Sequence, residues 1–74
     1  MKLFVINKDE FDNDFKSQNS QKEIHKTAYN FLLQCIGYDD SIPKTIEFDY
    51  DIFKVTFTFI SEKNNVYFYE YKKE

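Results

Sequence analysis

The sequence contains no arginine, and its ten basic residues are all lysine. Arginine forms the two-pronged contacts that hold phosphate groups and guanine bases most effectively. The formal net charge is −3 and the pI is ≈ 5.1. Direct binding of this chain to nucleic acid is therefore not expected.

Cysteine, glycine and proline each occur once. Cys35 has no partner for an internal disulfide, which suits a reducing cytoplasm. A single glycine rules out a glycine-rich phosphate-binding loop. No apolar run approaches the roughly 18 residues of a membrane span, and the run near the N-terminus is too short for a signal peptide. We therefore expect a cytoplasmic protein with no membrane association.

Groups for catalysis or metal binding are equally scarce. His25 and Cys35 lie ten residues apart on one predicted helix, about 15 Å along its axis, too far apart for a nucleophile and its base. An acidic stretch near the N-terminus contains Asp9, Glu10, Asp12 and Asp14. This stretch lacks the glycine and the terminal glutamate of a calcium-binding loop. The sequence predicts no catalytic residue, no metal site and no cofactor, and hence no enzyme.

The 74 residues are expected to form a single domain, 1–74. A chain of this size buries only roughly 60% of its unfolded surface, so its core is thin. Aromatic residues make up 20% of the chain, and their large rings compensate for the small size. The abundance of Lys, Asn, Ile, Phe and Tyr is typical of an AT-rich genome.

Two short elements are predicted first. Residues 2–6 read as a strand that is apolar on both faces, which favours a buried or central position in a sheet. Residues 8–16 read as a short helix, with Phe11 and Phe15 one turn apart on the same side.

A long amphipathic helix is predicted over residues 20–36, where apolar residues recur at helical spacing. Ser20 and Glu23 form a capping-box pattern at its start. Gly37 stands where a left-handed C-terminal cap is expected.

Three strands follow Pro43. Alternation over residues 45–50 slips by one position before Phe53, which indicates a tight turn at Tyr50-Asp51 or, alternatively, a β-bulge in one long strand. The turn would pair Phe48 with Phe53, Ile46 with Val55, Glu47 with Lys54 and Thr45 with Thr56. The last strand covers residues 66–72. The predicted fold is α+β with two layers: one short and one long helix on an antiparallel sheet of about four strands, in the order β-α-α-β-β-β.

Tyr67, Tyr69 and Tyr71 stand at alternate positions and so share one face of the last strand. A loop of two or four residues before this strand would leave them on the open face, and an odd loop would bury them. We favour open tyrosines, because Val66 and Phe68 are the more apolar pair. Glu70 opposes this choice, since it would then fall on the core side.

Residues 39–51 carry five acids against one lysine. They provide either solubility or a docking surface for a basic partner. The predicted partner-binding residues are Tyr67, Tyr69, Tyr71, Asp39, Asp40, Glu47, Asp49 and Asp51.

Small, acidic, arginine-free, aromatic α+β chains resemble, as a class, the single-domain inhibitors and accessory proteins of phages and mobile elements. The resemblance implies a non-enzymatic protein-binding module whose partner is a host protein, basic or acting on nucleic acid. Two alternatives remain open. One is a single-stranded nucleic-acid-binding module that uses the tyrosines as a stacking platform. The other is a self-associating structural domain that forms a homodimer.

Overall fold

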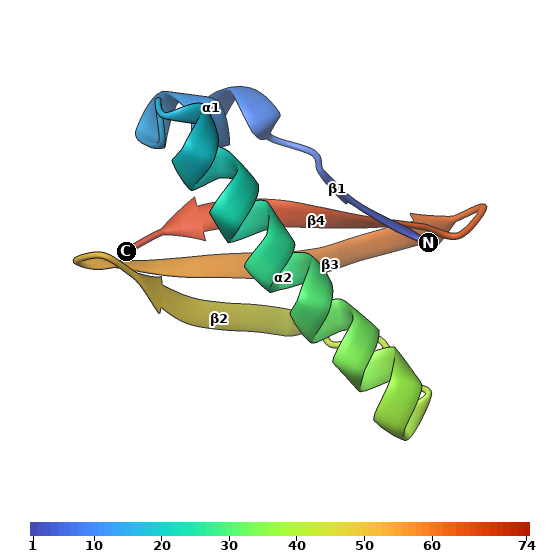
Figure 1. Ribbon diagram of the computed structural model, residues 1–74. Helices are drawn as coiled ribbons and strands as arrows, with labels where there is room; N and C mark the ends of the chain where they lie inside the picture. The colour runs from blue at the N-terminus through green and yellow to red at the C-terminus, as the bar shows by residue number, and fades with distance from the viewer.

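The computed structural model describes residues 1–74 as two layers, a four-stranded sheet with the helices on one of its faces. The long helix α2 crosses the sheet diagonally (Figure 1). The elements are β1 (Lys2–Val5), α1 (Lys8–Asp14), α2 (Gln18–Asp39), β2 (Thr45–Tyr50), β3 (Phe53–Lys63) and β4 (Val66–Lys73). The predicted α+β fold and its element order are confirmed.

The strands lie in the order β1-β4-β3-β2. The last three strands form the expected antiparallel meander, but β1 adds to β4 in parallel, so the sheet is mixed and not antiparallel throughout as predicted. The prediction of a buried or central position for the first strand is wrong, because β1 lies at one edge. Leu3 and Val5 point into the core, whereas Phe4 and Ile6 are exposed. No second layer covers the side of the sheet opposite the helices.

Helix α2 extends beyond the predicted range at its N-terminal end. Ser17 is the N-cap, and its hydroxyl accepts a hydrogen bond from the Ser20 amide at 3.4 Å. The predicted capping pair instead binds the Tyr50 hydroxyl, which lies 3.1 Å from Ser20 Oγ and 3.0 Å from Glu23 Oε2. These two residues therefore connect α2 to β2 through hydrogen bonds.

The C-terminal end of α2 also lies beyond the prediction. Asp40 adopts the left-handed conformation, with φ of 51°, and its amide donates to the Ile36 carbonyl at 3.1 Å. Aspartate is one of the few residues other than glycine that visits this region routinely. Gly37 lies inside the helix, and the prediction of a glycine cap is wrong.

Asn7 connects β1 to α1, and its side chain continues the ladder between β1 and β4. Its Nδ2 donates to the Tyr71 carbonyl at 2.8 Å, and its Oδ1 accepts from the Tyr71 amide at 2.8 Å. The side-chain amide thus replaces the next peptide unit of β1. The chain can turn away into α1 while the backbone groups of Tyr71 remain paired.

A hairpin joins β2 to β3, as predicted, but its turn lies at Asp51-Ile52, one residue later than expected. Asp51 has a φ of 58°, a conformation that aspartate tolerates better than most residues. The pairs on the core side are Ile46 with Phe57, Phe48 with Val55, and Tyr50 with Phe53. The predicted pairs are therefore wrong by two positions, and such a shift leaves every side chain on its predicted face.

The hairpin between β3 and β4 contains both a tight turn and a β-bulge. Asn64 and Asn65 form a two-residue turn with φ of 52° and 65°, the left-handed pair of a type I′ turn. Phe59 pairs with Tyr69, and Ser61 with Phe68, so Ile60 lies between them as an extra residue. A two-residue turn alone would have turned the tyrosines outward. The extra residue shifts the alternation by one and turns them toward α2.

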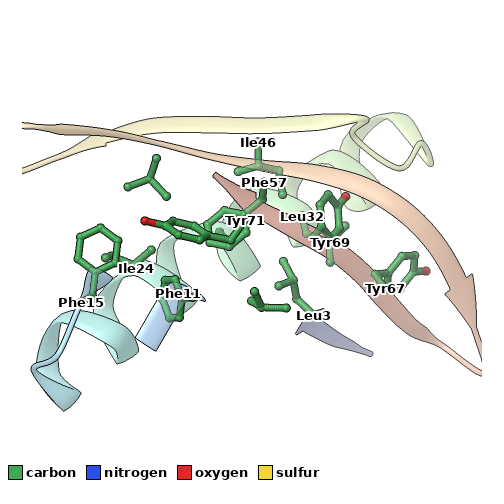
Figure 2. Packing of buried hydrophobic residues seen from close by; sticks show 13 residues of the cluster. Leu3, Phe11, Phe15, Ile24, Leu32, Ile46, Phe57, Tyr67, Tyr69 and Tyr71 are labelled. Atoms are coloured by element: carbon green, nitrogen blue, oxygen red, sulfur yellow. The ribbon is translucent and has the colours of Figure 1, made fainter. Parts of the chain in front are cut away.

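The core lies between α2 and the sheet, and α1 closes one end of it (Figure 2). Helix α2 contributes Ile24, Ala28 and Leu32 to the core. From α1 and the residue after it come Phe11 and Phe15, whose ring centroids lie 5.7 Å apart. The Phe11 ring also meets Tyr71 edge-on at 5.1 Å. Edge-to-face contacts of this kind stabilise aromatic clusters beyond their burial alone.

Candidate interaction surface

The three alternating tyrosines of β4 are core residues. The exposed fraction is 9% for Tyr67, 0% for Tyr69 and 2% for Tyr71. Figure 2 shows the three rings among the other buried side chains. The prediction that they form an open face is wrong, and the physical reason is the bulge at Ile60. No partner can reach these rings in the folded protein.

Two of the buried phenols have partners for their hydroxyl groups. Tyr69 donates to the Pro43 carbonyl at 2.7 Å, and Tyr71 donates to Asp14 Oδ2 at 2.9 Å. A buried hydroxyl without a partner would cost free energy, so these contacts make burial of the rings favourable. They also attach β4 to the start of β2 and to the end of α1.

The same burial raises the pKa of both phenols. Removal from water raises the pKa of Tyr69 from 10.0 to about 12, with smaller contributions from Cys35 and Tyr67. The pKa of Tyr71 is also raised, chiefly by burial. Its hydrogen bond to Asp14 and the negative charge of that carboxylate raise it further. Both hydroxyl groups therefore stay protonated near neutral pH. This is expected of core tyrosines and not of groups that exchange protons at that pH.

Phe4 is the exposed aromatic residue of the sheet and lies on the face opposite the helices, whereas the exposed Phe31 and Tyr38 belong to α2. Phe4 of β1 pairs with Phe68 of β4, and their ring centroids lie 5.6 Å apart in an edge-on arrangement. Phe4 is 42% exposed, and Phe68 is half-buried. Val66, two residues before Phe68 on β4, and Ile6, the residue after β1, extend the apolar area. We call Phe4, Ile6, Val66 and Phe68 the open-face patch.

Sequence reasoning missed this patch, although its signal was visible. Residues 3–6 are all apolar, and this pattern alone predicts a strand buried on both faces. In a sheet covered on one face only, the same pattern leaves every second residue exposed. Phe68 alternates with the tyrosines, so it faces outward whenever they face inward.

The predicted acidic surface is divided among three places. Asp39 and Asp40 end α2, Glu47 and Asp49 lie on the open side of β2, and Asp51 occupies the turn after β2. All five residues are exposed. The chain between Asp40 and Asp51 includes the whole of β2, whose six residues span about 20 Å when extended. The structure therefore brings only Glu47 and Asp49 together.

Charges of both signs lie on the open face beyond the open-face patch. Lys54 pairs across the hairpin with Asp49, and its Nζ lies 3.6 Å from Glu47 Oε1. The predicted contact between Glu47 and Lys54 thus forms between diagonal neighbours. On β4, Glu70 and Lys72 follow Phe68 on the same face and are exposed. The open face is apolar at one end and mixed in charge at the other.

No three of the histidine, cysteine, aspartate and glutamate side chains gather closely enough to hold a metal ion. Neither helix combines the length and the apolar character that a bilayer-crossing helix needs. Comparison of the chain with protein-family models, with curated proteins and with solved structures finds no match.

Proposed function

We propose that this chain is a non-enzymatic protein-binding module of the inhibitor or accessory class, which docks a protein partner on the open face of its sheet. The observation that supports the proposal is the pair Phe4 and Phe68, which lies on a face that no helix covers. The rings are held by two paired strands, so little further ordering is needed when a partner covers them.

The surroundings of the rings match the anatomy of a protein interface. Such interfaces place aromatic anchors at the centre and polar residues at the rim. Here the open-face patch is the anchor, and Glu70 and Lys72 begin the rim on β4. A rim of both signs suits a partner of mixed charge.

The proposal has two further parts. A basic or nucleic-acid-acting partner would meet Glu47 and Asp49 on the same face as the patch. Origin in a phage or mobile element follows from the class resemblance alone. The alternative of a single-stranded nucleic-acid module is not retained, because stacking requires open ring faces and Tyr67, Tyr69 and Tyr71 are buried.

Partner binding is tested with the double variant Phe4→Thr/Phe68→Thr, which keeps strand-forming side chains but removes both rings. The matched control is Ile52→Thr in the β2–β3 turn, where an exposed apolar residue lies away from the open-face patch. Each protein is immobilised and exposed to a lysate of an AT-rich bacterium, and affinity for the retained protein is then measured.

We expect the wild type and Ile52→Thr to retain the same protein and the double variant to bind it at least tenfold more weakly, since two central aromatic anchors are lost. Thermal denaturation confirms that all three proteins are folded. Equal retention by the double variant would contradict the proposal. A concentration-dependent dimer in light scattering that the double variant abolishes would contradict it too, because the patch would then be a homodimer interface.

A further inference from the structure

A groove of about 570 Å³ runs along β1 between this strand and the two helices. Its floor is apolar and includes Leu3, Val5 and Phe11, all buried. The open-face patch lies chiefly on the other side of the sheet. The groove is therefore a second surface, which shares only Phe4 with the open-face patch.

The backbone at the outer edge of β1 faces this groove. The Lys2 amide donates to Asn65 at 3.1 Å, and the Ile6 amide donates to Tyr69 at 2.9 Å, so the even-numbered residues face β4. In a parallel strand the residues between them point their N–H and C=O groups to the other side. The N–H groups of Leu3 and Val5 and the Val5 carbonyl are thus directed to the free edge.

One group on this edge already has a side-chain partner. His25 of α2 donates from Nε2 to the Leu3 carbonyl at 2.8 Å. This contact fixes the distance between α2 and β1 at one end of the groove. The remaining edge groups offer both donors and an acceptor, which is what an added strand would bind.

The side chains around the groove are basic, although the chain as a whole carries a net charge of −3. Lys2, Lys8 and Lys22 line it, and no aspartate or glutamate does. Lys8 is paired with Asp12 at 2.9 Å. Lys2 and Lys22 form no ion pair, so their charges are available to a ligand.

We propose that this groove binds an extended acidic segment of a protein partner, which adds to β1 as a fifth strand. Backbone hydrogen bonds to Leu3 and Val5 would hold the segment in place, and its carboxylates would meet Lys2 and Lys22. Alternate apolar side chains of the segment would lie on the floor of the groove. This inference does not rest on the proposed function and names a second binding surface, on the other side of Phe4 from the rest of the open-face patch.

A peptide fits the groove better than a nucleic acid does. Single-stranded nucleic acids bind through stacked ring faces as well as cations; of the two rings that line the groove, Phe11 is 3% exposed, and Phe4 is packed edge-on against Phe68. In contrast, the unpaired N–H and C=O groups at a strand edge have the same spacing as the backbone groups of an extended peptide, so the two can form hydrogen bonds.

The test uses a short peptide of alternating glutamate and valine, with blocked ends. Binding is followed by NMR at low salt, together with hydrogen exchange of the Leu3 and Val5 amides. A lysine–valine peptide and an oligothymidine serve as comparison ligands. Lys22→Glu is the variant that reverses a charge lining the groove, and Lys26→Glu makes the same change one turn later on α2, outside the groove.

We expect the acidic peptide to bind, to slow exchange of both amides, and to bind about fivefold more weakly to Lys22→Glu. Lys26→Glu should change affinity by less than about twofold. No binding of the acidic peptide, or equal weakening by both variants without amide protection, would overturn the proposal. Preferential binding of oligothymidine would overturn it in favour of a nucleic-acid groove. A stable fold in both variants is checked by the same spectra.

Discussion

The Tyr69→Ala variant is expected to lose about 3–5 kcal/mol of unfolding free energy, the range for removing a large ring from a protein core. Tyr69 is 0% exposed, and its hydroxyl is bound to Pro43. A chain of 74 residues has roughly 4–11 kcal/mol of stability in total. The variant should therefore be partly or largely unfolded at room temperature, as measured by urea denaturation followed by circular dichroism.

Two companion variants separate the causes of this loss. Tyr38→Ala removes a ring that is 86% exposed and should change stability by no more than about 0.5 kcal/mol. Tyr69→Phe keeps the ring but leaves the Pro43 carbonyl without its donor, which should cost about 1–3 kcal/mol. If Tyr69→Ala were as stable as Tyr38→Ala, the placement of the β4 tyrosines in the core would be refuted.

Deletion of Glu70 from β4 is expected to abolish most of the stability, whereas deletion of Ile60 from β3 should be tolerated. Both residues are exposed. Without Glu70, Tyr71 would follow Tyr69 directly and would face away from the core, a loss of at least about 3–5 kcal/mol. Without Ile60, the pairs on each side of the bulge meet in a continuous ladder, and every neighbouring side chain keeps its face.

The two deletion variants are compared by urea denaturation and by the NMR signals of their core methyl groups. The Ile60 deletion should remain within about 1 kcal/mol of the wild type, with the same residues in the core. An equal loss of stability in both variants would mean that Ile60 is required for the β3–β4 pairing and is not an extra residue in the ladder.

Local patterns were sufficient to predict the order of the elements and most of the buried side of α2, although Phe31, at the same helical spacing, is 42% exposed. Ile24, Ala28 and Leu32 recur at helical spacing, and all three are buried. The helix ends could not be predicted, because Ser17 and Ser20 are equally suitable N-caps by residue type. Which serine becomes the N-cap depends on Tyr50 of β2, because its hydroxyl forms hydrogen bonds with Ser20 and Glu23.

The side of the sheet on which the β4 tyrosines lie could not be predicted, for a related reason. The loop at Asn64-Asn65 suggested one face, and only the extra residue at Ile60 reverses it. A bulge leaves little local trace, since its stability comes from the rows of side chains that it aligns. Glu70 was the one residue whose charge opposed the favoured choice, and it is exposed in the structure.

The sequence predicts an open aromatic face on the sheet, formed by the three tyrosines of β4. The structure does expose an aromatic pair, but it consists of Phe4 and Phe68 instead of the tyrosines. The tyrosines suit the core because their hydroxyls reach Pro43 and Asp14 across it. These hydrogen-bond partners are distant from the tyrosines in the sequence, so local sequence patterns do not predict them.

A pH titration of the Tyr69 ring by NMR tests whether the β4 tyrosines form the core beneath α2. We expect the ring to stay neutral as the pH passes 10 and to ionise only near pH 12 or together with unfolding. Because the unfolded chain releases this proton more easily, the contribution of Tyr69 to stability is present below pH 10.0 and declines toward pH about 12. Ionisation with a midpoint near 10 while the fold stays intact would show that the ring faces water, and the bulge, the core and the open-face patch would all have to be reassigned.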